Sequence, residues 1–123
     1  MSRGDHSDLS ELSAELARSV AETMQSLATP SRVRILALLG AGPCAVSELS
    51  EGLGMAQPAV SQQLRILRHL GLVVGRREGR QVIYSLHDEH VRSLLVEAIS
   101  HTEHLRRAML ADAEPAPHAG ARA

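Results

Sequence analysis

The sequence of 123 residues is poor in aromatic residues and in cysteine. It contains no tryptophan and no phenylalanine, and Tyr84 is its one aromatic residue. Proteins that bind single-stranded nucleic acid stack bases on aromatic rings, so this scarcity argues against that class. Cys44 is the one cysteine. It excludes an internal disulfide framework and a thiolate-rich metal site, and it fits a reducing compartment.

Long apolar runs and enzyme motifs are also missing. No run reaches the roughly 20 residues that a membrane-spanning helix needs. Residues 1–8 lack the apolar segment of a signal peptide, so we expect a cytoplasmic protein with no membrane partner. The length suits a single domain of about 100 to 150 residues. Because we find no nucleophile with a paired base, phosphate-binding loop or hydrolytic metal motif, we expect neither an enzyme nor a small organic substrate.

Lysine is absent, and the arginines are unevenly distributed. The 13 basic residues are all arginine, and the net charge is -1. Residues 1–30 hold two arginines and five acidic residues, whereas residues 54–85 hold five arginines and only Glu78 as an acid. Arginine makes forked contacts to phosphate and guanine, so the basic stretch predicts a nucleic-acid surface.

The periodicity of apolar residues predicts two helices in the first third of the chain. Leucine, valine and methionine recur every three or four residues from Leu9 to Leu27, which is typical of one apolar helix face. Thr29 and Pro30 provide an N-cap and a first-position proline for a second helix. Gly40 and the residues that follow it end this helix.

The middle of the chain predicts a winged helix-turn-helix. A helix over 45–53 ends at Gly54, and a second over 57–70 ends at Gly71. Apolar and polar residues alternate in segments 72–75 and 80–86, on either side of a turn at 77–79. This pattern predicts a β-hairpin, which we call the wing. A last helix runs from Asp88 to about residue 110. The expected fold is therefore mainly α with a small hairpin, in the order α-α-α-α-β-β-α, over residues 9–110. Residues 1–8 and 111–123 are predicted to be disordered.

The helix over 57–70 separates apolar from polar residues, which predicts a DNA-reading face. Polar residues near its N-terminus would reach base edges in the major groove of double-stranded DNA. These candidates are Gln57, Ser61, Gln62 and Gln63. Arginines of the helix and the wing would contact phosphates. These candidates are Arg65, Arg76, Arg77 and Arg80.

The last helix carries a metal-ligand pattern that one chain cannot close. Asp88 and His90 precede His101 and His104, in the pattern Asp-x-His-x10-His-x-x-His. At about 1.5 Å per residue, His90 and His101 lie roughly 16 Å apart along the helix axis. Two such helices, packed antiparallel about a dyad near Leu95, would bring Asp88 and His90 of one chain beside His101 and His104 of the other. The dimer would then hold two equivalent sites. Three imidazoles and one carboxylate suit Zn(II), Co(II) or Ni(II).

The same helix has an apolar stripe with nothing after it to cover it. We therefore expect a homodimer formed through the first and last helices. The predicted interface residues are Leu12, Leu16, Val91, Leu94, Leu95 and Ala98.

Several segments resemble the ArsR/SmtB family of metal-responsive repressors. They are residues 28–32 (Ala-Thr-Pro-Ser-Arg), 60–64 (Val-Ser-Gln-Gln-Leu), 70–73 (Leu-Gly-Leu-Val) and 82–86 (Val-Ile-Tyr-Ser-Leu). The resemblance covers about residues 9–110. It implies a repressor that leaves its operator when metal binds between the C-terminal helices of the dimer. Arsenic-sensing members place a Cys-x-Cys pair where this chain has Ala45 and Ser47.

Within the family, the chain resembles the nickel/cobalt sensors of the NmtR type, which favours Ni(II) or Co(II), with Zn(II) as the alternative. Those sensors recruit further nitrogen ligands from the chain termini, with a histidine directly after the first residue. Here the first histidine is His6, so His6 and His118 are the candidates for fifth and sixth ligands.

Two other functions agree with parts of the pattern. One is a DNA-binding regulator with no metal response, either constitutive or controlled by a protein partner. The other is a metal-binding dimer module without DNA function. Loss of metal response on replacing His101, and loss of DNA binding on neutralising the wing arginines, would separate them.

Overall fold

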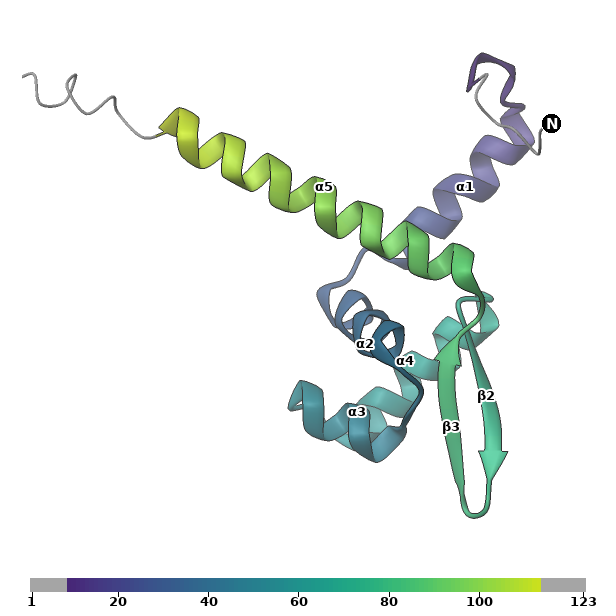
Figure 1. The fold of residues 1–123 in the computed structure, drawn as a ribbon. Helices are drawn as coiled ribbons and strands as arrows, with labels where there is room; N and C mark the ends of the chain where they lie inside the picture. Colours follow the sequence, from purple (N-terminus) through teal and green to yellow (C-terminus); the bar gives the residue numbers. More distant parts are fainter. Residues whose placement is uncertain (1–8, 114–123) are drawn as a thin grey trace, which may run out of the picture. The chain divides into compact units, whose positions relative to one another are not determined.

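The computed structural model describes residues 9–113 and consists of helices with one small antiparallel sheet (Figure 1). The chain divides into two compact units, residues 1–87 and 88–123. The predicted order of helices and hairpin is confirmed, with one short strand added. The elements are a 3-10 turn (Leu9–Glu11), α1 (Ala14–Ser26), α2 (Pro30–Ala41), β1 (Cys44–Ala45), α3 (Val46–Leu53), α4 (Gln57–His69), β2 (Val73–Glu78), β3 (Gln81–Leu86) and α5 (Glu89–Ala113).

The core of the first unit is aliphatic and is built by α2, α3 and α4. Ile35, Leu49 and Leu64, one from each helix, have no exposed surface. Val60 and Leu67 lie one turn before and after Leu64 and are equally buried. Burying a side chain of this size contributes about 1.5–3 kcal/mol. The apolar face of α4 thus anchors the helix, and its polar face is left to solvent.

A tight turn joins α3 to α4. Gly54 caps α3 in the left-handed conformation with φ +67°, which a residue with a Cβ adopts at a cost. The Ser50 hydroxyl donates to the carbonyl of Met55 across the turn. At the other end of α3, the Glu48 carboxylate accepts from the backbone N–H of Ala45 at 2.8 Å. These contacts fix both ends of a helix of only eight residues.

The sheet has the strand order β1-β3-β2. Gly79, with φ +64°, and Arg80 form the two-residue connection between β2 and β3, because Glu78 already pairs with Gln81. The prediction that the turn occupies 77–79 was therefore wrong by one to two residues. Glycine at the first loop position is the pattern of a type II′ hairpin turn.

Strand β1 was not predicted. Cys44 and Ala45 pair with Tyr84 and Ile83 of β3. Two residues are too short for an alternating pattern, and their backbone partners lie about 40 positions later in the chain. Because Ala45 belongs to this strand, α3 begins at Val46 rather than at residue 45.

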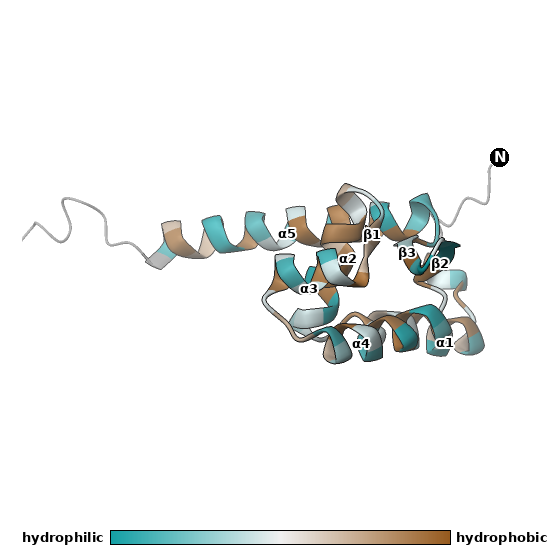
Figure 2. Ribbon diagram, turned by 90° about the horizontal axis from the view of Figure 1, so that it is seen from below, coloured by the Kyte–Doolittle hydropathy of each residue, from teal (hydrophilic) through white to brown (hydrophobic). Residues whose placement is uncertain are grey.

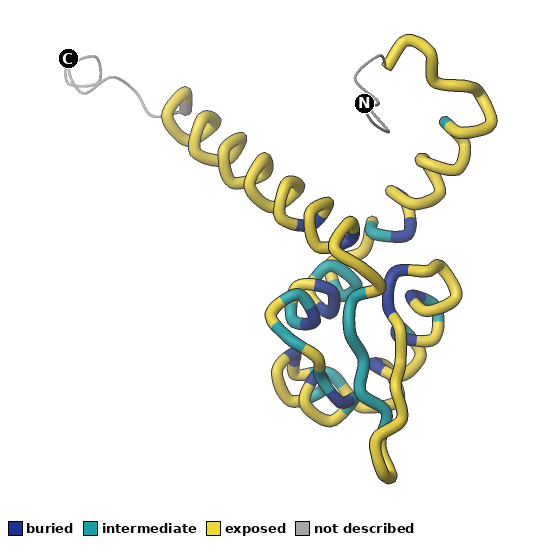
Figure 3. The backbone as a smooth tube through the Cα atoms, turned by 45° about the vertical axis from the view of Figure 1, so that its right-hand side comes forward, coloured by how far each residue is buried: buried dark blue, intermediate teal, exposed yellow. Residues whose placement is uncertain are grey.

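Helix α1 begins later than predicted and is almost fully exposed. The Ser13 hydroxyl accepts from the N–H of Leu16 at 3.0 Å, so Ser13 is the N-cap and Leu9 lies in a separate 3-10 turn. Among its residues, only Ser26 is buried (Figure 3). Leu16, Val20 and Met24 recur every four residues and are all exposed. Figure 2 shows hydrophobic residues, in brown, among hydrophilic ones, in teal, along α1.

Helix α5 begins at Glu89 and extends through Ala113, three residues beyond the predicted end at Leu110. The Asp88 carboxylate (Oδ1) accepts from the N–H of Val91 at 3.1 Å and so caps its first turn. Val91 and Leu95 are buried, whereas most of the helix is exposed. Of the described residues, no helix has the length and apolar content to cross a membrane.

Candidate DNA-binding surface and metal ligands

The polar face of α4 is open, as the sequence predicted. Gln57, Ser61 and Gln62 are exposed, while Val60 and Leu64 beside them are buried. Pro58 lies in the first turn, where it leaves no helical hydrogen bond unmade. This first turn therefore presents amide and hydroxyl groups that can donate to and accept from base edges.

Gln63 has a different environment from its neighbours. It is half-buried, and its Oε1 accepts from Nε of Arg32 at 2.9 Å. Nη1 of Arg32 also donates to the carbonyl of Ser26 at 3.2 Å. Gln63 thus ties α4 to α2 and to the end of α1, and its role in base reading stays a prediction.

The arginines proposed to contact phosphate differ in their surroundings. Arg65 is exposed on α4. Arg77 and Arg80 are exposed at the end of the wing, where Arg80 forms part of the turn. Arg76 instead forms an ion pair with Glu78 on the same strand, and its Nε lies 3.1 Å from Oε2 of Glu78. This pairing reduces the charge that Arg76 offers to DNA.

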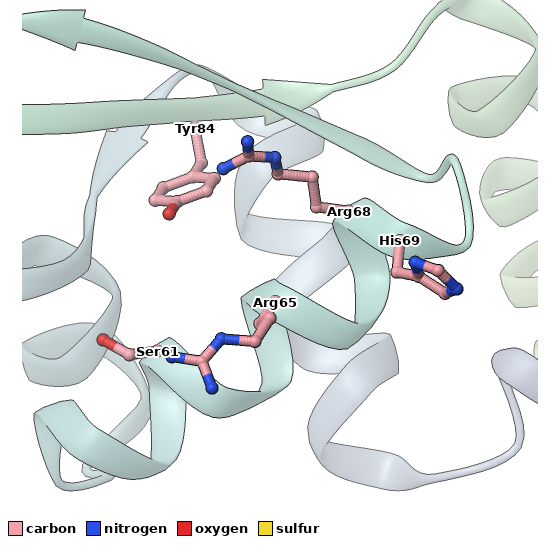
Figure 4. Close-up of a pocket in the computed structure, with 5 residues that line it drawn as sticks. All are labelled: Ser61, Arg65, Arg68, His69 and Tyr84. Atoms are coloured by element: carbon pink, nitrogen blue, oxygen red, sulfur yellow. The ribbon is translucent and has the colours of Figure 1, made fainter.

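A hollow between α4 and β3 brings two of the predicted DNA-contacting residues together with three residues that were given no role from the sequence (Figure 4). Its lining consists of Ser61, Arg65, Arg68, His69 and Tyr84. Arg68 follows Ser61 by seven residues, so helix periodicity alone places these two side chains on one face. No local signal in the sequence connects Tyr84 to them, because β3 reaches α4 only through the fold.

A second hollow lies next to the first turn of α4. It shares Ser61 and Tyr84 with the first hollow and includes Gln57. The remaining lining residues are Ala45, Val46, Ser47, Gln81 and Val82. The start of the reading helix therefore faces polar side chains from the wing.

Asp88 and His90 lie close together at the start of α5. Nδ1 of His90 is 3.7 Å from Oδ2 of Asp88, and the His90 side chain is 97% exposed. Because Oδ1 of Asp88 caps the helix, Oδ2 is the carboxylate oxygen turned toward the imidazole. One nitrogen and one oxygen donor thus face the same solvent region.

His101 and His104 are exposed on the same helix, one turn apart. A rise of about 1.5 Å per residue separates them from His90 by roughly 16–21 Å. Among the described residues, no three histidine, cysteine or acidic side chains of the single chain converge on one point. The four predicted ligands therefore lie in two separate pairs along the chain, and His6 and His118 lie outside the described residues.

The predicted interface residues fall into two groups. Leu12, Leu16, Leu94 and Ala98 are exposed. Val91 and Leu95 are buried, with 8% and 6% of their surface exposed, and their place in an interface stays a prediction. The exposed stripe of α5 follows the histidines instead, since His90, Leu94, His101 and Leu105 recur at spacings of four and seven.

Cys44, in β1, is half-buried and has a protonated thiol. Burial raises the pKa of Cys44, and the nearby Glu48 carboxylate raises it further. Only the thiolate is nucleophilic.

We therefore expect iodoacetamide to alkylate Cys44 at pH 8 more slowly in the folded protein than in the urea-unfolded chain. The Glu48→Gln variant should react faster than the wild type. Equal rates for folded and unfolded protein would contradict the assignment.

Comparison with known proteins finds relatives that regulate transcription. The model of the bacterial regulatory protein family arsR matches residues 29–74, from the start of α2 to β2. The chain is 58% identical, over 94 residues, to the HTH-type transcriptional regulator NmtR of Mycobacterium tuberculosis, covering 76% of this chain and 78% of that protein. It is also 38% identical over 87 residues to the HTH-type transcriptional repressor SmtB of the same species, covering 71% of this chain and 64% of the repressor.

Solved structures agree with the fold. The solution structure of apo-NmtR matches with a TM-score of 0.68 and 53% identity, covering 85% of this chain and 87% of that one. A homodimeric winged helix-turn-helix DNA-binding domain from Mycobacterium bovis matches with a TM-score of 0.69 and 33% identity, covering 85% and 95%. The relatives are regulators, in agreement with the expectation that the chain is not an enzyme.

Proposed function

Because this chain belongs to the arsR family of bacterial regulatory proteins, we propose that it is a homodimeric transcriptional repressor whose operator binding is controlled by a divalent metal. The observation that carries the DNA-binding part is the open polar face of α4 above a fully buried apolar face. The metal part is supported by the positions of the four predicted ligands, because Asp88 and His90 lie at the start of α5 and the exposed His101 and His104 lie further along it.

In the proposed complex, α4 lies in a major groove. Gln57, Ser61 and Gln62 read base edges there, because their amide and hydroxyl groups both donate and accept. Arg65, Arg77 and Arg80 contact phosphates and supply affinity without sequence information. Two copies of α4 in a dimer would read half-sites about 34 Å apart, one turn of DNA.

The second chain is required for two independent reasons. The apolar stripe of α1, with Leu16, Val20 and Met24, is exposed in the single chain. The exposed stripe of α5 includes Leu94, which lies between the histidines, and Leu105, which lies beyond them. Burial of such stripes against their symmetry mates is the usual reason for a two-fold dimer.

The metal ligands in this proposal are Asp88 and His90 from one protomer with His101 and His104 from the other. Nitrogen and carboxylate donors without thiolate suit Ni(II), Co(II) or Zn(II), and the NmtR-like sequence favours the first two. These four residues would hold the ion between the two α5 helices. His6 and His118 remain the candidates for additional ligands if the coordination number is six.

Asp88 has two roles that connect metal binding to the helix. Its Oδ1 holds the first turn of α5, and its Oδ2 is 3.7 Å from Nδ1 of His90. A ligand that recruits this carboxylate therefore favours one arrangement of the start of α5. A ligand that prefers one dimer geometry shifts the population toward it, and operator affinity changes by the same coupling free energy, typically about 1–3 kcal/mol.

Operator binding by the metal-free and metal-loaded dimer tests this proposal. The probe is a duplex selected by the metal-free protein from a random-sequence library. We expect Ni(II), Co(II) or Zn(II) to weaken binding by about 5- to 150-fold. Unchanged affinity with all three metals would reject the sensor and leave a regulator without metal response. Ligand-field absorption with Co(II) and Ni(II) would distinguish tetrahedral from octahedral coordination.

Replacing Gln62 by alanine tests base reading. We expect Gln62→Ala to weaken binding to the selected duplex by about 2–6 kcal/mol, because the dimer loses two bidentate base contacts of about 1–3 kcal/mol each. Binding to a scrambled duplex should be unchanged. The matched control is Gln25→Ala, which removes an exposed glutamine of α1. If Gln62→Ala loses the same affinity for both duplexes, measured by fluorescence anisotropy, Gln62 contacts the DNA backbone and not a base.

A further inference from the structure

The hollow between α4 and β3 combines positive charge with hydroxyl groups and contains no acid. Arg65 and Arg68 line it together with Ser61, His69 and Tyr84. Within residues 9–113, neither arginine has a carboxylate at ion-pair distance. The one acid of the wing, Glu78, is paired with Arg76. Two uncompensated guanidinium groups at one concave site form an anion-binding surface.

Tyr84 is held in this hollow by the sheet. It lies in the central strand β3, paired with Cys44 on one side and Gly75 on the other. A Cβ added to Gly75 would lie 3.1 Å from Cε1 of Tyr84. The ring therefore rests against the bare backbone of Gly75, and any side chain there would displace it.

Four of the five lining residues form two pairs in the hollow, Arg68 with Tyr84 and Arg65 with Ser61. In Figure 4, Arg68 extends toward the Tyr84 ring, Arg65 extends toward Ser61, and His69 lies at the far end of the helix from Ser61. The donors come from both α4 and the wing, so the hollow lies at the junction of the two DNA-binding elements.

We propose that this hollow binds one backbone phosphate of double-stranded DNA, with Arg68 and Tyr84 as its principal ligands. This inference rests on the proposed function. If α4 occupies a major groove and the wing follows the adjacent minor groove, the strand that separates the two grooves must pass between α4 and β3. Arginine binds phosphate oxygens through its forked N–H groups, and the Tyr84 hydroxyl can donate to the same oxygens.

A phosphate ligand acts on all sequences alike, unlike a base reader. Both protomers of the dimer carry the change, so the Arg68→Gln variant should lose about 25- to 100-fold in affinity at 0.1 M salt, five- to tenfold for each contact, for both a selected duplex and a scrambled duplex of the same length. The slope of log K against log salt should decrease in magnitude by about 1.8, the value for two phosphates. The Tyr84→Phe variant keeps the ring against Gly75, removes only the hydroxyl, and should weaken both duplexes by a smaller factor.

The matched control is Arg92→Gln, the same substitution on α5, where Arg92 is paired with Glu89 at 3.4 Å. Its affinity and salt slope should equal those of the wild type. Circular dichroism and metal stoichiometry of each variant show that the dimer is intact.

A scan with methylphosphonates, which remove the charge of one phosphate at a time from the duplex, identifies the contact directly. One position in each half-site should weaken the wild type and have no further effect on Arg68→Gln. If the wild type binds both duplexes and Arg68→Gln keeps the wild-type salt slope, the phosphate site is overturned and the proposed repressor stands. If the wild type binds no duplex, the repressor is overturned as well.

Discussion

A mixture of the His90→Gln and His101→Gln variants should bind metal tightly, although neither variant does so alone. Each homodimer of a single variant lacks one ligand in both of its sites. We expect its metal affinity to decrease by at least about 100-fold, since even partners outside the ligand set cost 10- to 100-fold. A heterodimer, however, contains one site with both changes and one site with all four natural ligands.

This rescue follows from the placement of the ligands on α5. His90 and His101 lie roughly 16 Å apart on one straight helix, and no three such groups converge within the described part of one chain. After subunit exchange at equal concentrations, half of the dimers are mixed, so about one quarter of all sites should be intact. Competition with a chelator, or Co(II) absorption, measures this fraction.

Two results would contradict the dimer-spanning site. If either variant alone keeps wild-type metal affinity, the replaced histidine is not a ligand. If the mixture shows no rescue although subunit exchange is verified with differently tagged chains, all ligands come from the same protomer. Both variants should retain metal-free operator binding, because neither histidine belongs to α4 or the wing.

Replacing Leu64 by alanine should have the largest effect on stability. Leu64 is fully buried in the middle of α4. Truncating such a leucine costs about 2–5 kcal/mol, because a cavity remains where the side chain was. Small domains have only about 5–15 kcal/mol of stability in total. We therefore expect Leu64→Ala to unfold at much lower urea concentration and to bind DNA poorly for that reason.

The matched control is Leu70→Ala, the same truncation at the end of α4, where the leucine is 43% exposed. Its cost should be about 0.5 kcal/mol or less. Urea unfolding must be compared at one protomer concentration, since the stability of a dimer depends on it. Similar midpoints of urea unfolding for the two variants would mean that burial of Leu64 does not hold α4 in place.

Helix α4 and the wing show how much could be predicted from local pattern. The alternation of buried Val60 and Leu64 with exposed Ser61 and Gln62 is a helix-period signal, and the structure reproduces it. The glycine at the tip of the hairpin was also recognised, although the turn itself lies one to two residues later. Helix starts were less accurate, because a hydroxyl cap at Ser13, not the first apolar residue, decides where α1 begins.

Contacts between distant segments could not be predicted in this way. Strand β1 exists because Cys44 and Ala45 meet β3. Gln63 has the same residue type as Gln62, yet its amide is bound by Arg32, 31 positions earlier.

By itself, the sequence determined the order of elements, and it predicted the DNA-reading helix and the division of the metal ligands between two protomers. Periodicity, capping residues and ligand spacing are local properties that the chain carries in any conformation. Only the tertiary structure decided which polar residues are free. It bound Gln63 to Arg32, paired Arg76 with Glu78, and brought Tyr84 to Arg68. These outcomes depend on which strand or helix lies beside a residue, and that is fixed by burial of the common core.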